Sequence, residues 1–157
     1  VKPHIQEKVD DFVQKVFQNY FVIGVHYRGT DKGREAPRVS YENVFMEIDR
    51  HLEALNQCLI FIATDEMDLK DELKKRYPGI VVTTNAQCAN AGGDGLHFLF
   101  EHKYHIGEEA LIDCLLLSRC SMLIRTSSSL SLWSTYFNPN LPVILLNNRW
   151  QETLEPE

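Results

Sequence analysis

Residues 20–32 read YFVIGVHYRGTDK, an apolar run rich in β-branched and aromatic side chains that stops at a cluster of polar groups. A run of this kind is typical of a strand that is buried on both faces of a parallel sheet. It brings His26, Arg28, Asp31 and Lys32 to the carboxyl end of the strand. Ligands bind at this edge of open parallel sheets, so the stretch predicts a binding site there.

Three of these polar residues, His26, Arg28 and Asp31, follow a His-x-Arg-x-x-Asp spacing. Because residues i and i+2 share a face of a strand, His26 and Arg28 can project into one crevice. An arginine offers a planar fork of donors to phosphate or carboxylate oxygens, and Asp31 can accept a proton or hold Arg28 in place. The residues also fit a simpler interpretation, in which an Arg–Asp ion pair closes the strand beside an ordinary, partly buried histidine.

The composition is that of an ordinary globular protein. The chain has 157 residues, 44% of them hydrophobic and 24% charged, and we expect a single domain with one well-buried core. A net charge of -6 and a pI near 5.5 argue against a protein that binds nucleic acid or a membrane surface. No run approaches the ~18 apolar residues of a membrane helix. An anionic ligand must therefore be bound by local donors.

Four cysteines are widely spaced along the chain, at Cys58, Cys88, Cys114 and Cys120. They form no C-x-x-C pair, and no histidine stands at the spacing of a metal site. Cys58 opens an apolar run, and Cys114 and Cys120 flank another. These positions favour buried thiols over a zinc site, and we expect no metal.

Strand and helix signals alternate along the chain. Apolar runs predict strands within 20–27 and at 58–63, 80–84, 121–124 and 143–146. Helical spacing predicts helices over 5–16, from an N-cap at Ser40 to 55, from a cap at Asp65 to 76, over 107–119 and over 130–137. Residues 32–39 and 85–95 are predicted loops. The pattern predicts an α/β fold, a Rossmann-like doubly wound parallel sheet of about five strands, most simply in the order 3-2-1-4-5.

In that order the first and fourth strands are neighbours, and nucleotides bind in the crevice between their ends. The fourth strand is followed by a second polar cluster, Thr126, Ser127, Ser128 and Ser129, at the start of a predicted helix. Hydroxyl and N–H groups at a helix N-terminus form an anion site that the helix dipole favours. A pyrophosphate bound there would meet Arg28 from the other side. Ser127 or Ser128 equally fits the role of a simple N-cap.

Three blocks of the sequence resemble, in order, the conserved motifs of GDP-fucose-dependent fucosyltransferases, the superfamily of α1,6-, α1,2- and protein O-fucosyltransferases. The blocks are 23–32 (IGVHYRGTDK), 61–66 (FIATDE), and 109–118 (EALIDCLLLS) together with 126–131 (TSSSLS). The resemblance covers nearly the whole chain. It departs at Gly29, where α1,6-type enzymes have a second arginine.

The resemblance implies a site for GDP-fucose. By position, His26 and Asp113 would lie near the guanosine, Arg28 on the β-phosphate, and Ser128 or Ser129 on phosphate or ribose. Arg28 would stabilise the charge that develops on the departing GDP, a role that needs no metal.

Inversion at the fucose carbon also requires a base that takes the proton of the acceptor. Asp31 and Glu35 are the local carboxylates, and the family pattern places an acid close to the position of Glu35. For Asp31, a structural role that bonds Arg28 or the loop backbone is the competing interpretation.

The resemblance further implies an inverting glycosyltransferase of GT-B architecture, with this chain as its C-terminal, donor-binding domain. Its partners would be GDP-fucose, a glycan or glycoprotein acceptor and an N-terminal domain of the same chain, with no cofactor, no nucleic acid and no membrane contact. The compartment would be the Golgi or ER lumen in a eukaryote and the cytoplasm in a bacterium. Two other hypotheses stay open: a non-catalytic nucleotide-sugar-binding domain, and a GT-B enzyme that uses another nucleotide sugar.

Overall fold

A computed structural model describes residues 1–29, 37–84 and 103–147. The described strands form a five-stranded sheet in the order β3-β2-β1-β4-β5, and every neighbouring pair is parallel. The strands are β1 (Phe21–Tyr27), β2 (Cys58–Thr64), β3 (Val81–Val82), β4 (Met122–Arg125) and β5 (Val143–Leu145). The predicted fold class and strand order are confirmed.

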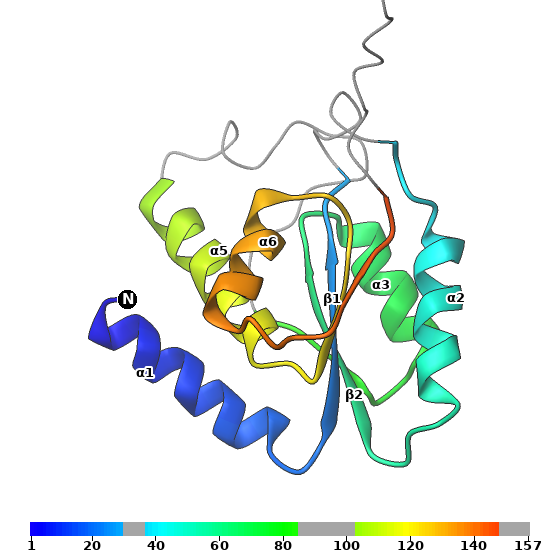
Figure 1. The fold of residues 1–157 in the computed structure, drawn as a ribbon, viewed down its shortest axis with the longest axis horizontal. Coiled ribbons are helices and arrows are strands. Elements are labelled where there is room, and N and C mark those ends of the chain that lie inside the picture. The colour runs from blue at the N-terminus through cyan, green and yellow to red at the C-terminus, as the bar shows by residue number, and fades with distance from the viewer. Residues whose placement is uncertain (30–36, 85–102, 148–157) are drawn as a thin grey trace, which may run out of the picture.

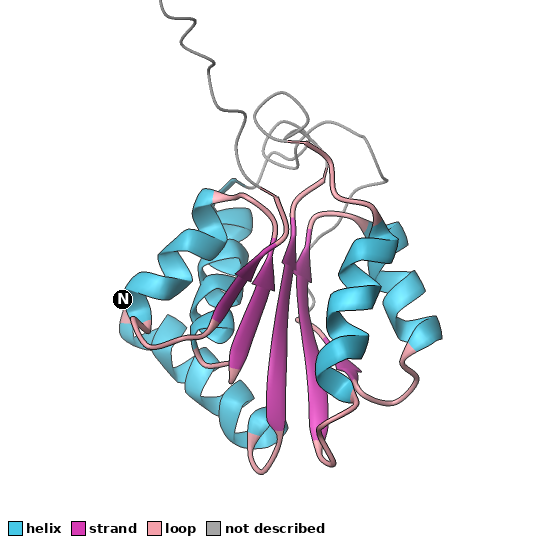
Figure 2. Ribbon diagram, turned by 45° about the vertical axis from the view of Figure 1, so that its right-hand side comes forward, coloured by secondary structure: helices cyan, strands magenta, loops and turns pink. Residues whose placement is uncertain are grey.

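Helices cover both faces of this sheet (Figure 1, Figure 2). One face carries α2 (Tyr41–Leu52) and α3 (Met67–Arg76); the other carries α1 (Pro3–Phe12), α5 (Lys103–Ser118) and α6 (Ser129–Phe137). A π-helical turn, Val13–Phe17, extends α1 towards β1. Because the connections leave β1 and β4 on opposite faces, the carboxyl ends of these two strands form the switch point of the fold.

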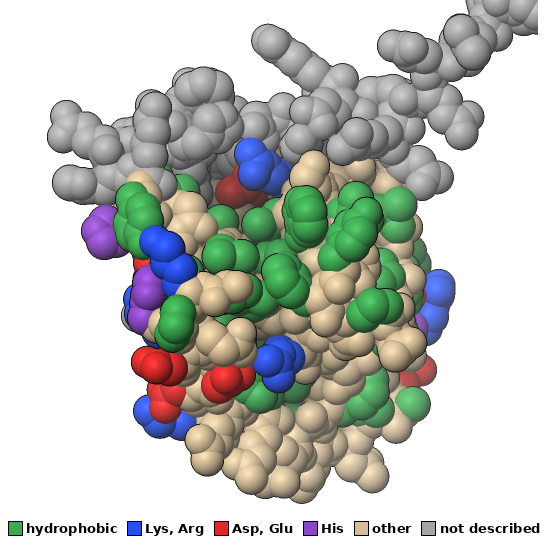
Figure 3. All heavy atoms as spheres, turned by 60° about the vertical axis from the view of Figure 1, so that its left-hand side comes forward, with side chains coloured by type: hydrophobic (Ala, Val, Ile, Leu, Met, Phe, Trp, Pro, Cys, Tyr) green, Lys and Arg blue, Asp and Glu red, His purple; other side chains and the backbone are tan. Residues whose placement is uncertain are grey.

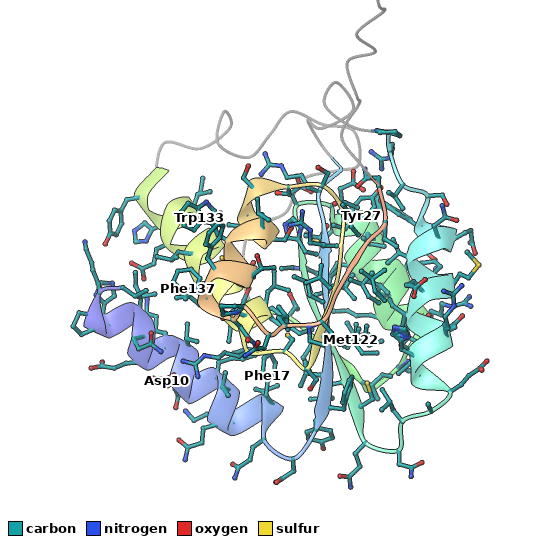
Figure 4. The ribbon with its side chains drawn as sticks, viewed as in Figure 1. Asp10, Phe17, Tyr27, Met122, Trp133 and Phe137 are labelled. Atoms are coloured by element: carbon teal, nitrogen blue, oxygen red, sulfur yellow. The ribbon has the colours of Figure 1, made fainter. Side chains whose placement is uncertain are left out.

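Strand β1 is the centre of the domain because its alternating side chains enter two apolar cores. Val25 and Tyr27 pack under α2 and α3, and Figure 4 shows Tyr27 near the carboxyl end of the strand. The ring of Tyr27 meets that of Tyr41 edge-on. On the other face, a Cβ at Gly24 would lie 2.9 Å from Cys120 Sγ. The absence of a side chain at Gly24 therefore lets the end of α5 approach the sheet.

Several boundaries agree with the predictions and two do not. Ser40 caps α2 as predicted, and its Oγ accepts from the Asn43 N–H at 3.3 Å. Helix α5 begins at Lys103 rather than at 107, and Glu108 pairs with Lys8 of α1 at 2.5 Å instead of marking a first turn. Strand β3 has two residues rather than 80–84, and among the described strands it is the partly exposed edge that pairs with β2.

The outer side of α6 is apolar and exposed. This helix carries no charged residue, and its exposed large hydrophobic side chains are Leu132, Trp133, Tyr136 and Phe137. Figure 3 shows hydrophobic side chains gathered on one face of the molecule, and Figure 4 shows Trp133 and Phe137 on α6. Contiguous exposed apolar groups are typical of surfaces that contact other protein. Among the described residues, no helix is long and apolar enough to cross a membrane.

Candidate functional site

The two polar clusters of the sequence meet at the carboxyl ends of β1 and β4. His26 of β1 lies in register with Arg125 of β4. The Thr126 N–H donates to the His26 carbonyl at 3.0 Å, and the Arg28 N–H donates to Thr126 Oγ1 at 3.0 Å across 98 residues of sequence. The structure therefore brings His26, Arg28 and Thr126 together at the switch point, as the strand order predicts.

Arg28 is held by a carboxylate from the neighbouring strand. The pairing of Tyr27 with Thr64 places Asp65 directly beside Arg28. Asp65 Oδ1 accepts from the Gly29 N–H at 3.2 Å, and Asp65 Oδ2 lies 3.5 Å from Arg28 Nε. The side chain of Arg28 is 26% exposed, so it is oriented and still accessible.

The resemblance of residues 61–66 to the family motif places Thr64 and Asp65 near the cleft, and Asp65 was equally expected as a helix cap. The structure puts Asp65 at the cleft beside Arg28, and the helix cap is wrong. The N-cap of α3 is Glu66, which makes no side-chain capping bond. Asp65 makes tertiary contacts to β1 instead.

The serine cluster forms the turn from β4 into α6. Ser128 is the N-cap residue, as the simpler interpretation predicts, with an extended backbone (φ -159°), although its side chain makes no capping hydrogen bond. The Ser127 N–H donates to Asn147 Oδ1 at 2.7 Å. Thr126 and Ser128 are buried, whereas Ser129 is exposed. The backbone of the turn is thus fixed from the side, and Ser129 stands at the surface.

Arg125 is a site residue that sequence reasoning missed. It is buried, and its Nη1 donates to the Ser128 carbonyl at 3.4 Å and to Ser131 Oγ at 3.3 Å. The available signal was a charged residue between the apolar run 121–124 and the serine cluster. Its guanidinium lies under the first turn of α6, where its charge adds to the positive end of the helix.

His26 is buried on the same side of the sheet as Arg125. Burial, together with the charges of Arg125 and Arg28, lowers the pKa of His26 to about 3, so the ring is neutral at pH 7. Its Nδ1 has no hydrogen-bond partner among the residues that the structure describes. A buried polar atom without a partner costs free energy, so Nδ1 is available to a ligand or to a water molecule.

Asp113 contacts the end of β3 rather than Arg28. Thr84 Oγ1 donates to Asp113 Oδ1 at 2.7 Å, and β2 separates β3 from β1. Burial raises the pKa of Asp113 to about 7, with the charge of Glu109 adding to the effect and the Thr84 hydrogen bond and Lys70 opposing it. Asp113 therefore lies two strands away from the Arg28 cluster, as a carboxyl group poised to ionise near neutrality.

Both candidate bases, Asp31 and Glu35, lie outside the described residues, as do the predicted loop 85–95 and Cys88. The residues that flank 30–36 are fixed by hydrogen bonds to their backbone carbonyls. Arg38 Nη1 donates to the Gly29 carbonyl at 2.9 Å, and Asn147 Nδ2 donates to the Pro37 carbonyl at 2.6 Å. The two ends of this segment are thereby fixed next to Arg28 and the serine turn.

A steric contact explains why residue 29 is a glycine. A Cβ placed there would lie 2.5 Å from Glu66 Cδ, and the Glu66 side chain is fully buried. The structure thus leaves no room at Gly29 for the second arginine of α1,6-type enzymes.

Three of the four cysteines lie in the described ranges. Cys58, Cys114 and Cys120 are buried free thiols, as predicted. In the described ranges, no group of three or more His, Cys, Asp and Glu side chains is arranged to hold a metal ion. The donors at the edge of β1 and β4 are guanidinium, hydroxyl and backbone N–H groups, a set that suits an anionic ligand.

Solved structures show the same fold. NodZ α-1,6-fucosyltransferase co-crystallized with GDP matches with a TM-score of 0.66 and 25% identity, over 92% of this chain and 44% of that chain. The same enzyme soaked with GDP-fucose matches with a TM-score of 0.63 and 25% identity, over 85% of this chain and 41% of that chain. A mutant of FUT1 from Arabidopsis thaliana, in complex with GDP, has a TM-score of 0.58 and 13% identity, over 96% and 34% of the two chains. The FUT1 match concerns the fold alone.

This chain spans less than half the length of those relatives. The family model for nodulation protein Z (NodZ) matches residues 1–150. That match includes every described strand and helix, and with them His26, Arg28, Asp113 and the serine turn. The chain belongs to the NodZ family.

Proposed function

We propose that this chain is the donor-binding domain of a fucosyltransferase and binds GDP-fucose at the carboxyl ends of β1 and β4. The observation that carries the proposal is the position of Arg28, held by Asp65 and bonded through its N–H to Thr126, beside the N-terminus of α6. A guanidinium and a helix N-terminus at one crevice suit a diphosphate. The complexes of NodZ with GDP and with GDP-fucose support this choice of ligand.

In this proposal Arg28 binds the β-phosphate. The hydroxyl and N–H groups of Thr126, Ser127, Ser128 and Ser129 bind phosphate or ribose. His26 and Asp113 bind the nucleoside: neutral His26 satisfies its Nδ1 there, and ionised Asp113 accepts from N–H groups of guanine. Guanidinium and helix-end charge offset the charge of the diphosphate, so no metal is required.

The reaction would transfer fucose with inversion. The bond between fucose C1 and the β-phosphate oxygen breaks, and its electron pair leaves with GDP, where Arg28 stabilises the new charge. The acceptor oxygen bonds to C1 from the opposite side and gives its proton to a base, for which Asp31 and Glu35 are the candidates. The acceptor is a glycan or glycoprotein.

The acceptor site would come largely from another part of the enzyme. The chain covers 44% of NodZ, and a GT-B enzyme binds its two substrates between two such domains. We therefore infer that this is a single, C-terminal domain of a larger enzyme. Alone, it would bind GDP weakly and transfer little fucose.

Calorimetric titration with GDP, GDP-fucose and UDP, in the presence of EDTA, tests the proposal. We expect the wild type to bind both guanine nucleotides in preference to UDP, and Arg28→Ala to bind them far more weakly, with an affinity still measurable at high nucleotide concentration. Arg50→Ala is the matched control, because Arg50 is an exposed arginine of α2 whose salt bridge within the described part of the chain is to Glu47 of the same helix. In the full-length enzyme, Arg28→Ala should lose ~3 kcal/mol of transition-state stabilisation, or roughly a hundredfold in rate.

The proposal is wrong if neither this chain nor the full-length protein prefers GDP to UDP. Binding that appears only when Mg²⁺ replaces EDTA would contradict the metal-independent part.

A further inference from the structure

The residue after Arg28 is a glycine whose backbone is held from two sides. The Gly29 N–H donates to Asp65 Oδ1 at 3.2 Å, and the Gly29 carbonyl accepts from Arg38 Nη1 at 2.9 Å. Glycine has the widest conformational freedom of any residue, so the peptide that follows Arg28 has no intrinsic reason to keep one orientation. The side chains around Gly29 must supply that restraint.

Glu66 fills the space beside Gly29. Its carboxylate is fully buried and accepts from Tyr41 OH at 2.5 Å. Arg38 Nη2 donates to Glu66 Oε2 at 3.0 Å and lies 2.9 Å from Oε1. One guanidinium therefore bonds the Gly29 carbonyl with one nitrogen and a buried carboxylate with another. A planar fork holds the two acceptors in a fixed arrangement, whereas an ammonium group would have to reach both from a single nitrogen.

This cluster links three separate parts of the chain. Glu66 follows β2, Gly29 follows β1, and Arg38 with Tyr41 leads into α2. The Tyr27 hydroxyl adds a bond to the Val39 carbonyl at 2.7 Å. The Glu66 side chain is held in place by its burial, whereas the side chain of Arg38 is 44% exposed.

We propose that Arg38 and Glu66 are positioning residues for Arg28: together they fix the Gly29 peptide and so set the direction in which the Arg28 guanidinium meets the diphosphate. The inference rests on the proposed function of Arg28. Neither Arg38 nor Glu66 needs to touch the nucleotide. Their effect should therefore appear only through the phosphate that Arg28 binds.

The test compares ligands that differ by that phosphate. Arg38→Gln should weaken GDP binding about tenfold while changing the affinity for GMP less than about twofold, because misplacing one anchoring group costs one to two orders of magnitude. In an Arg28→Ala background, Arg38→Gln should have no further effect on GDP. Arg38→Lys keeps the charge but loses the fork, and we expect it to behave like Arg38→Gln.

Arg76→Gln is the matched control. Arg76 is equally exposed (46% against 44%) and also pairs with a carboxylate, Asp49 at 2.7 Å, between α2 and α3. It should leave both nucleotide affinities unchanged. Urea unfolding of each variant checks that the fold is intact. If Arg38→Gln does not fold, Arg38→Lys gives the same comparison of GDP with GMP. Tyr41→Phe gives it too, because this change removes only the hydroxyl that donates to Glu66.

Four outcomes would overturn the inference. GDP affinity that Arg38→Gln leaves intact shows that Arg38 does not position Arg28, and equal losses for GDP and GMP show a merely structural role. Additive losses in the double variant show that Arg38 acts independently of Arg28. A wild type that binds no GDP, alone or in the full-length protein, overturns the proposed function as well, so the two failures are distinguishable.

Discussion

Asp113 gives the domain a stability that falls as the pH rises. Its side chain is buried, and its pKa is raised from 3.8 to about 7 chiefly by that burial. The folded state therefore holds the proton more tightly than the unfolded state does. The stabilisation is fully present below the unfolded pKa and is lost as the pH rises through the folded one. Asp113→Asn removes this titration, because the amide stays neutral at every pH.

The size of the effect follows from the two pKa values. A difference of about three between them corresponds to about 4 kcal/mol at high pH. Part of this stabilisation is already lost at pH 5, which lies above the unfolded pKa. Between pH 5 and pH 8 we therefore expect the free energy of unfolding of the wild type to fall by about 2.5 kcal/mol relative to Asp113→Asn. Other groups, including His26, titrate in both proteins and cancel in the comparison.

Urea unfolding followed by circular dichroism at a series of pH values measures this difference. Asp71→Asn, which removes a carboxylate from an exposed position of α3, shows what the loss of charge alone does. If the stabilities of the wild type and Asp113→Asn change in parallel with pH, the buried environment of Asp113 does not raise its pKa and the reasoning fails.

Two further predictions concern β1. Because the pKa of His26 is lowered to about 3, the wild type should lose stability as the pH falls from 6.5 towards 3. The loss should reach up to about 5 kcal/mol relative to His26→Gln, measured by acid unfolding of both proteins. Equal acid sensitivity of the two proteins would argue against a buried neutral ring. Gly24→Ala should cost about 1–3 kcal/mol in urea unfolding, since the new Cβ would lie 2.9 Å from Cys120 Sγ. Gly24→Ala/Cys120→Ala should recover part of this loss, and an unchanged Gly24→Ala would show that α5 has room to move.

Much of the fold can be predicted from the sequence, because apolar runs and helical spacing are local patterns. The run 20–27 is apolar on both faces, which only a central strand of a covered sheet requires. The alternation of such runs with helical patterns then leaves few strand orders, and the observed order is the simplest of them. The placement of Arg28 next to the serine turn follows from that order.

What could not be predicted depends on contacts between distant segments. A carboxylate before a helix resembles a cap, yet Asp65 turns to Arg28 because of the register of β1 and β2. Glu66 looks like an ordinary surface acid and is fully buried by its bonds to Arg38 and Tyr41. Neither residue carries a periodic or compositional signal. The family resemblance of residues 61–66 places Asp65 near the cleft, and the three-dimensional structure shows which groups Asp65 and Glu66 contact.

The central place of β1 also has a consequence for the order of folding. β1 meets β2 through contacts such as Gly29 to Asp65, 36 residues apart, but meets β4 through contacts such as Arg28 to Thr126, 98 residues apart. Closing the longer loop costs more entropy, so we expect the β1–β2 pair to form first and β4 to dock late. The crevice is complete only after that last step. A nucleotide bound there should therefore slow unfolding while leaving the rate of folding nearly unchanged.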